Sequence, residues 1–165
     1  MTASSVGCAL CPRLVASRSR IVESVVVGEA GEGGILFVGQ APGKVEDRMG
    51  EPLKGPAGQK QRALLAGLGV HDYILSNACR CYPEHDRKPT KDEVENCSGW
   101  LAEDILKYKP SLIVAVGEVG ETAAILASRV AGVVVPIRRM LHPSAVLHRP
   151  SQQERFEREG YEAIF

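Results

Sequence analysis

The five cysteines of this 165-residue chain are the residues whose spacing most directly suggests chemistry. Cys8 and Cys11 form a CxxC pair near the start, and Cys81 and Cys97 form a second pair far downstream. Four thiolates supplied as two pairs suit a tetra-thiolate site, which holds either an iron–sulfur cluster or structural zinc. Such a site would tie the beginning of the chain to its middle. Cys79, two residues before Cys81, is an additional thiol.

A Gly/Pro loop lies between the two cysteine pairs. It begins with Gly39-Gln-Ala-Pro-Gly43, directly after the apolar run 35–38, and is expected to run to Gly58. Open α/β sheets place their ligand sites at the carboxyl ends of strands, and glycines let backbone N–H groups approach a base or a phosphate closely. Taken alone, the same loop is equally typical of an ordinary strand-to-helix turn.

Strands and helices alternate along the chain. The apolar runs predict strands at 35–38, 73–76 and 112–116, and the run 133–135 begins a fourth strand that leads to His142-Pro-Ser144. Helices are expected at about 59–68, after the capping box of Thr90 and Glu93, near 119–129 and over 152–165. Cys97 falls on the apolar stripe of the second of these helices and is expected to face inward. This order predicts a three-layer α/β/α sandwich around a mostly parallel four-stranded sheet. Residues 1–20 are interpreted as an irregular cysteine-bearing arm, and residues 1–165 as a single domain.

The composition is that of an ordinary globular chain, with 44% hydrophobic and 24% charged residues. No apolar run approaches the roughly 20 residues that cross a bilayer, and the first residues lack the pattern of a signal peptide, so no membrane contact is expected. Cysteines in such a chain are better interpreted as ligands than as disulfides, which indicates a reducing, cytoplasmic compartment.

The formal net charge is zero, which argues against a broad basic surface for nucleic acid. A local basic cluster remains possible near the end of the chain. Arg138, Arg139, His142, His148 and Arg149 lie within twelve residues and could bind a few phosphates. The alternative is a solvated charged edge.

Taken in order, the motifs resemble the uracil-DNA glycosylase superfamily, specifically its iron–sulfur branch, family 4. They are the CxxC pair, Gly39-Gln-Ala-Pro-Gly43, Glu46-Asp47, the stretch 50–58, Ser76-Asn77, Cys81, Arg87-Lys-Pro89, Cys97 and His142-Pro-Ser144, and they span roughly residues 8 to 150. The resemblance implies a monomeric hydrolase of base-excision repair, associated with the nucleoid when it acts on DNA. Such an enzyme flips a pyrimidine, by default uracil, out of the DNA and hydrolyses its N-glycosidic bond to leave an abasic site.

The resemblance also assigns residues. It implies that Asn77 recognises the base and that His142 donates a hydrogen bond to the base O2 as negative charge develops there. It implies further pocket contacts from Gly39, Ala41, Gly43, Leu53 and Ser144. Leu147 is a candidate wedge that fills the gap left by the flipped base, or else a core leucine. Cys8, Cys11, Cys81 and Cys97 correspond to the ligands of a structural [4Fe–4S] cluster, with zinc as the alternative.

The first motif departs from the family pattern. Gln40 stands where the family has an acidic residue; family 1 has Gln at that place but follows it with an Asp, and here Ala41 follows. Neither position supplies a carboxylate to orient the attacking water. The nearest carboxylates are Glu46 and Asp47, and Glu46 is expected to act in catalysis together with His142 and Gln40.

Two other departures concern the substrate. Leu53 replaces the family's Phe that stacks on uracil, and Tyr82-Pro-Glu84 replaces Arg-Pro-Pro. Loss of the aromatic platform removes about 1–3 kcal/mol of stacking. Two alternatives therefore stay open: a glycosylase for a bulkier or modified base, and a non-catalytic iron–sulfur DNA-binding module.

Overall fold

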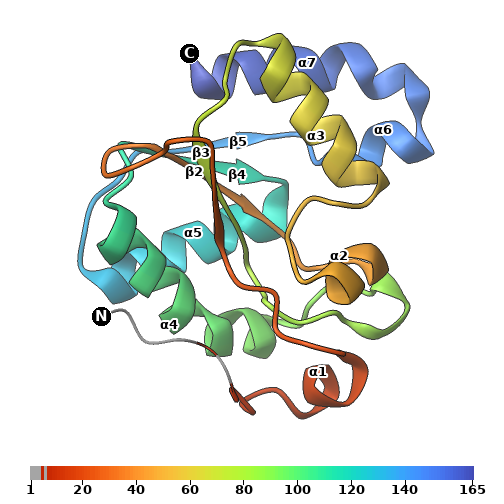
Figure 1. Ribbon diagram of the computed structural model, residues 1–165, viewed down its shortest axis with the longest axis vertical. Coiled ribbons are helices and arrows are strands. Elements are labelled where there is room, and N and C mark those ends of the chain that lie inside the picture. Colours follow the sequence, from red (N-terminus) through yellow and green to blue (C-terminus); the bar gives the residue numbers. More distant parts are fainter. Residues whose placement is uncertain (1–4, 6) are drawn as a thin grey trace.

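The computed structural model describes residue 5 and residues 7–165. A five-stranded sheet of order β1-β3-β2-β4-β5 forms its centre (Figure 1). The strands are β1 (Val25–Val27), β2 (Ile35–Gly39), β3 (Tyr73–Asn77), β4 (Leu112–Val116) and β5 (Ile137–Met140). β1 pairs antiparallel with β3, and the three other pairings are parallel. The mostly parallel sheet predicted from the sequence is therefore confirmed.

Helices cover both faces of this sheet. They are α1 (Pro12–Ser17), α2 (Lys44–Met49), α3 (Pro56–Gly67), α4 (Lys91–Tyr108), α5 (Glu118–Ala131), α6 (Ser144–His148) and α7 (Gln153–Ile164), with 3₁₀ turns at Glu84–Asp86 and Pro150–Gln152. In Figure 1, α4 and α5 lie on one side of the sheet, and α3, α6 and α7 lie on the other. The predicted three-layer α/β/α arrangement is confirmed.

The alternation of side chains along β2 shows how the two layers are filled. Leu36 and Val38 belong to the core cluster that contains residues of α4 and α5. Phe37 points to the opposite face and belongs to the cluster that contains Leu65 of α3 and Phe156 of α7. Because all three strand residues are almost fully buried, helices must cover the sheet on both faces, which is typical of parallel sheets.

Two expectations about the strands are wrong. The sheet has five strands rather than four, because β1 is an edge strand of three residues, too short for its pattern to stand out. The strand expected to begin at 133 begins at Ile137 instead, as β5, and residues 133–136 connect α5 to it. Gly132 ends α5 with a φ of 70°, and the N–H of Val133 bonds back to the carbonyl of Ser128. This hydrogen bond closes the helix end and leaves Val134 fully exposed, so the apolar run does not pair.

Two short helices interrupt segments that were expected to be irregular. The arm contains α1, which begins at Pro12 and buries only Leu14, and the Gly/Pro loop contains α2. Each has six residues, too few for a hydrophobic period to be recognised. Part of the predicted arm, residues 1–4 and 6, lies outside the described residues.

In the part of the chain that the structure describes, no helix is both long and apolar enough to cross a membrane. The carboxyl ends of β2, β3, β4 and β5 meet at one edge of the sheet, because these strands run parallel. The loops that leave this edge carry the motifs singled out in the sequence.

Candidate active site

A cavity of about 470 Å³ opens at the carboxyl edge of the sheet. It is lined by the loop after β2, the end of β3, the stretch before α3, the loop after β5 and the start of α6. All of the residues expected to bind or convert the substrate line it: Gly39, Gln40, Ala41, Gly43, Glu46, Leu53, Asn77, His142, Ser144 and Leu147. The structure thus brings together residues that are more than a hundred positions apart in the sequence.

His142 has a defined tautomer. Its Nδ1 lies 3.1 Å from the backbone N of Ser144 and 2.7 Å from the Ser144 hydroxyl. Because a backbone N–H can only donate, Nδ1 is the acceptor, and the ring proton of the neutral imidazole is on Nε2. Burial lowers the pKa of His142, which favours this neutral form. The result is a fixed Nε2–H donor at the cavity.

Asn77 ends β3 directly beside Gly39, its register partner on β2. A Cβ on Gly39 would lie 2.6 Å from Asn77 Oδ1, so only glycine leaves room for the amide there. The N–H of Ala78 bonds to the Gly39 carbonyl at 2.9 Å and fixes the two strand ends together. Among the described residues, nothing hydrogen-bonds to the Asn77 side chain, so its donor and acceptor are available to a ligand.

Glu46 binds backbone groups with both carboxylate oxygens. Oε1 accepts from the N–H of Gly43 at 2.9 Å. Oε2 accepts from the N–H of Lys54 at 2.9 Å and from that of Gly55. The carboxylate is only 9% exposed and connects the first-motif loop to the stretch before α3. This geometry gives Glu46 a positioning role; its expected role in catalysis stays a prediction.

Asp47, the other nearby carboxylate, faces away from the cavity. Its Oδ1 and Oδ2 lie 2.9 and 3.2 Å from the backbone N of Ser19, and it does not line the cavity. Asp47 therefore anchors the segment that follows α1.

Leu53 forms one wall of the cavity in an unusual backbone conformation. Its φ is 56°, a left-handed value that is rare for leucine. The Arg62 side chain donates to the carbonyls of Leu53, at 2.7 Å, and Pro52, at 3.2 Å. A Cβ on Gly58 would lie 2.3 Å from Leu53 Cα, so the glycine is required for this close approach. The position where the family has an aromatic residue is therefore rigidly held.

The opposite rim of the cavity was not expected from the sequence as a site. It consists of Pro83, Asp86 and Arg87, in the loop after Cys81. The sequence motifs include Arg87 but not Asp86. Asp86 carries no residue-type signal of its own, and its place at the cavity depends on the left-handed backbone of this loop, where the φ values of His85 and Asp86 are 57° and 55°.

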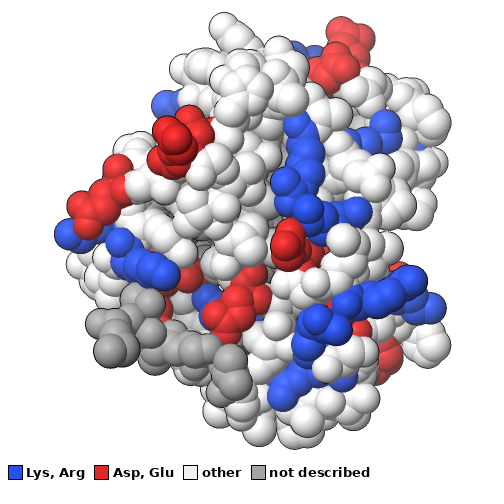
Figure 2. All heavy atoms as spheres, viewed as in Figure 1, with Lys and Arg blue, Asp and Glu red and all other residues white. Residues whose placement is uncertain are grey.

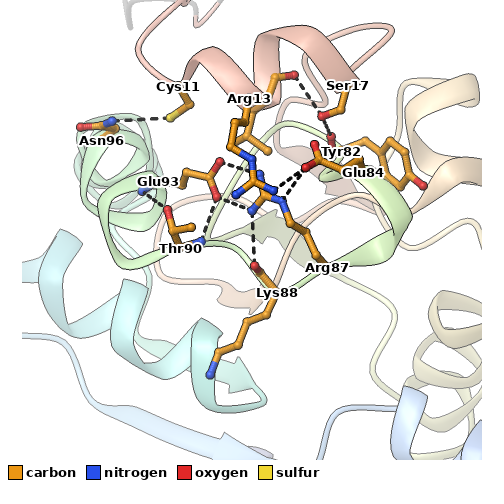
Figure 3. Close-up of polar contacts among 11 residues, drawn as sticks. Cys11, Arg13, Ser17, Tyr82, Glu84, Arg87, Lys88, Thr90, Glu93 and Asn96 are labelled. Atoms are coloured by element: carbon orange, nitrogen blue, oxygen red, sulfur yellow. Dashed lines mark hydrogen bonds and ion pairs between the residues drawn. The ribbon is translucent and has the colours of Figure 1, made fainter.

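Ion pairs hold this rim (Figure 3). Arg87 binds Glu93 of α4 through two hydrogen bonds of 2.7 and 2.9 Å, and lies 3.4 Å from Glu84. Glu84 in turn pairs with Arg13 of α1. The Arg87 guanidinium holds the pKa of Glu93 at about 2, and Arg13 lowers the pKa of Glu84. The acid that replaced a motif proline thus binds the arm and does not face the substrate.

The cysteines gather where α1, the chain after β3 and α4 meet. Arg18 bridges two of them, because its Nη1 lies 3.3 Å from Cys81 Sγ and its Nη2 lies 2.7 Å from the Cys8 carbonyl. Asn96 of α4 lies 3.6 Å from Cys11 Sγ (Figure 3). Cys97 is half-buried rather than fully inward, and the thiol of the fully buried Cys79 hydrogen-bonds to it.

This donor set fits a soft metal or cluster. Burial raises the pKa of the Cys11 and Cys81 thiols, whereas the hydrogen bond from Cys79 lowers that of Cys97. In the described residues, no three Cys, His, Asp or Glu side chains are close enough to count as a formed metal site. The four expected ligands nevertheless come from segments that already contact one another.

The structure divides the basic cluster expected near the end of the chain. Arg138 and Arg139 are neighbours on β5, so their side chains leave opposite faces of the sheet. Arg138 donates to the carbonyl of Ala163 in α7, and Arg139 pairs with Glu121 of α5, both at 3.4 Å. Only His142 and His148 of this group line the cavity. Figure 2 shows Lys and Arg side chains gathered instead over α2 and α3, the helices next to the cavity.

An α/β sandwich with a cavity at the carboxyl edge of its parallel strands has the architecture of an α/β enzyme with its ligand site at the strand ends. A model of the "Uracil DNA glycosylase superfamily" matches residues 26–164, and the chain belongs to this superfamily.

Named relatives agree with the family. The "Type-4 uracil-DNA glycosylase" of Archaeoglobus fulgidus is 34% identical over 142 residues, which cover 74% of this chain and 71% of the relative. The protein of the same name from Pyrobaculum aerophilum is 34% identical over 145 residues, covering 76% and 74%. A "Type-5 uracil-DNA glycosylase" of Pyrobaculum aerophilum is 31% identical over 149 residues, covering 73% and 66%.

Proposed function

We propose that this chain is a monofunctional DNA glycosylase of base-excision repair, with uracil as its default substrate. The observation that carries this proposal is the convergence of the free Asn77 amide and the neutral His142 on one cavity, in a chain whose relatives are named uracil-DNA glycosylases. DNA is therefore the proposed partner, the chain is proposed to act as a monomer and a single domain, and the compartment is the cytoplasm.

The chemistry follows from the groups at the cavity. When the N-glycosidic bond breaks, its electron pair stays on the base, and negative charge develops on the base O2. His142 Nε2–H donates to that oxygen, and the Asn77 amide pairs with the edge of the base. The loop from Gly39 to Gly43 approaches the base and its phosphate, and Leu53 supplies an apolar wall. Leu147, which is 42% exposed at the cavity, can act as the wedge in the DNA.

We further propose that Cys8, Cys11, Cys81 and Cys97 hold a [4Fe–4S] cluster, for which zinc is the non-redox alternative. When bound, the cluster would supply a rigid covalent link between α1, the chain after β3 and α4. Ser17 and Arg13 of α1 bind the loop of residues 82–84, so this link would steady the rim that contains Arg87.

The test is base release by anaerobically purified protein. Labelled oligonucleotides carry one uracil, either single-stranded or opposite G or A, and alkali cleavage reports the abasic sites. His142→Ala and Asn77→Ala should each lower the rate about 10²–10³-fold, since each removes one stabilising donor. Glu154→Gln, at an exposed position in the first turn of α7, is the matched control. Unchanged rates in both cavity variants would show that the proposed site is wrong.

A second candidate is a bulkier or modified pyrimidine. Leu53 and Gln40 favour it, because both line the cavity at places where the family has larger or acidic groups. Tyr82 gives no support, since its side chain is buried and its carbonyl binds Ser17. A panel of oligonucleotides with modified pyrimidines decides the question, and rapid cleavage of uracil with no other base released would exclude this candidate.

A further inference from the structure

The structure assigns a catalytic carboxylate to Asp86: we propose that it orients the attacking water and stabilises the cationic sugar, in place of the acid that the first motif lacks. This inference rests on the proposed glycosylase function and names the residue that would complete it.

Two carboxylates line the cavity, those of Glu46 and Asp86. Both oxygens of Glu46 already accept backbone N–H groups, so it has little capacity left for a water molecule. The Asp86 side chain is exposed and, within the described part of the chain, has no hydrogen bond or ion pair. Of the two, Asp86 is therefore the carboxylate with free acceptor capacity.

Asp86 also stands in a suitable place. A Cβ on Gly43 would lie 3.8 Å from Asp86 Oδ1, so the carboxylate lies next to the end of the first-motif loop, at the cavity that both line. Gln40 and Ala41, the positions where relatives carry an acid, belong to that same loop and line the same cavity. The first-motif loop lacks a carboxylate at Gln40 and Ala41, and Asp86 supplies one to the same cavity from the other rim.

The backbone of the rim places Asp86 at the cavity. Asp86 and the preceding His85 both have left-handed φ values, 55° and 57°, a conformation that costs of order 1–3 kcal/mol for each non-glycine residue. The backbone N–H of Asp86 bonds to the Pro83 carbonyl at 3.1 Å, and the flanking Glu84 and Arg87 are held by ion pairs. Strain that surrounding contacts sustain is typical of functional sites, where it holds a group ready for reaction.

Within the described residues, no Lys or Arg side chain forms an ion pair with the Asp86 carboxylate. The nearest cation in the sequence, Arg87, directs its guanidinium to Glu93 and Glu84. The negative charge of Asp86 is therefore available to the positive charge that develops on the sugar. As the bond between C1′ and the base nitrogen breaks, its electron pair leaves with the base. The water oxygen bonds to C1′, and the Asp86 carboxylate accepts the proton that this water loses.

The decisive variant is Asp86→Asn, which keeps the shape and removes the charge. On the base that the wild type releases, kcat should fall about 10²-fold while KM changes less than about threefold. Asp92→Asn, at an exposed position in the first turn of α4, is the matched control and should keep wild-type kcat. Adding Ala41→Asp to Asp86→Asn should restore at least about tenfold of the loss, because it returns a carboxylate to the facing rim.

A binding measurement keeps the inference testable without turnover. Oligonucleotides carrying a cationic pyrrolidine abasic analogue or a neutral tetrahydrofuran analogue are compared. Asp86→Asn should weaken binding of the cationic analogue about tenfold more than binding of the neutral one. An equal effect on both, or a kcat above half the wild-type value, would overturn the inference. If the wild type releases no base and does not prefer the cationic analogue, the proposed glycosylase function itself fails.

Discussion

The two rims of the cavity are held in different ways. The first rim, made of the loop from Gly39 to Gly43 and the stretch before α3, is joined by the single buried carboxylate of Glu46, whose partners lie at most nine residues away in the sequence. The second rim, residues 83–87, is held by ion pairs from α1 and α4, and Arg13 is 71 residues from Glu84. Backbone hydrogen bonds to one buried carboxylate fix the first rim, and ion pairs between side chains, of which the Arg13–Glu84 pair is long-range, fix the second.

The difference has a physical consequence. Backbone hydrogen bonds to a buried carboxylate are screened little by solvent, so the first rim should hold its shape over a wide range of salt. The ion pairs of the second rim are partly exposed and therefore depend on pH and ionic strength. The first rim is thus expected to be rigid, whereas the conformation of the second rim, which carries Asp86, is expected to vary with pH and salt.

Glu46→Gln breaks the first rim and should have the largest effect. The new amide places an N–H₂ group against backbone donors, so base release should fall about 10²–10³-fold and the free energy of unfolding by about 1–3 kcal/mol. Rate assays and urea denaturation measure the two losses. Glu51→Gln, an exposed neighbour that pairs with Lys54, is the control. A loss of rate with unchanged stability would instead assign Glu46 a direct catalytic role.

Glu93→Gln breaks the second rim at its most buried pair. Because Arg87 holds the pKa of Glu93 at about 2, below the ordinary value of 4.5, the pair stabilises the folded state above pH 4.5. This contribution, about 2–3 kcal/mol at most, is lost as the pH falls from 4.5 through 2. Urea denaturation at about pH 6 and pH 3 should show a smaller pH dependence in the variant. Glu95→Gln, on the exposed face of α4, should keep the wild-type dependence.

Cys81→Ser tests whether the cysteine site supports the second rim. We expect loss of bound iron and about tenfold slower base release, because α1 then holds the loop of residues 82–84 less firmly. Cys79→Ser should keep the iron, since this thiol is outside the expected ligand set. Iron and sulfide analysis with visible absorption separates the two variants. If Cys81→Ser kept the iron and Cys79→Ser lost it, Cys79 rather than Cys81 would be the third ligand.

The sequence predicted the residues of the first rim better than those of the second, because local sequence patterns indicate the first rim and not the second. The strand at 35–38, its loop, Asn77 and His142 follow from local runs and motifs, and parallel strands necessarily bring their carboxyl ends together. The place of Asp86 depends instead on left-handed backbone at two non-glycine residues, which the residue types His and Asp do not signal strongly.

The same limit explains the errors in the fold. The run 133–135 has strand-like residues, but the capping hydrogen bond from Val133 to Ser128 makes it a helix exit. β1 forms a strand only because β3 presents unpaired backbone groups at the edge of the sheet, a long-range feature that the local sequence does not show. Likewise, Glu84 replaces a proline of the family motif, and its partner Arg13 comes from a helix that the sequence did not indicate.

Arg13→Ala is the gentlest way to perturb the second rim and should have the smallest effect. Both partners of the Arg13–Glu84 pair are well exposed, with 61% and 36% of their side-chain surface accessible, and such pairs contribute little in water. Base release should change less than about twofold at low salt and be indistinguishable from wild type at about 0.5 M salt, where exposed charges are screened. Glu84→Ala should have a larger effect, because it also removes the contact to Arg87 at 3.4 Å. If Arg13→Ala slowed the reaction as much as Glu93→Gln does, and salt did not change this, the second rim would be as rigidly held as the first. The contrast between support by backbone hydrogen bonds and support by ion pairs would then fail.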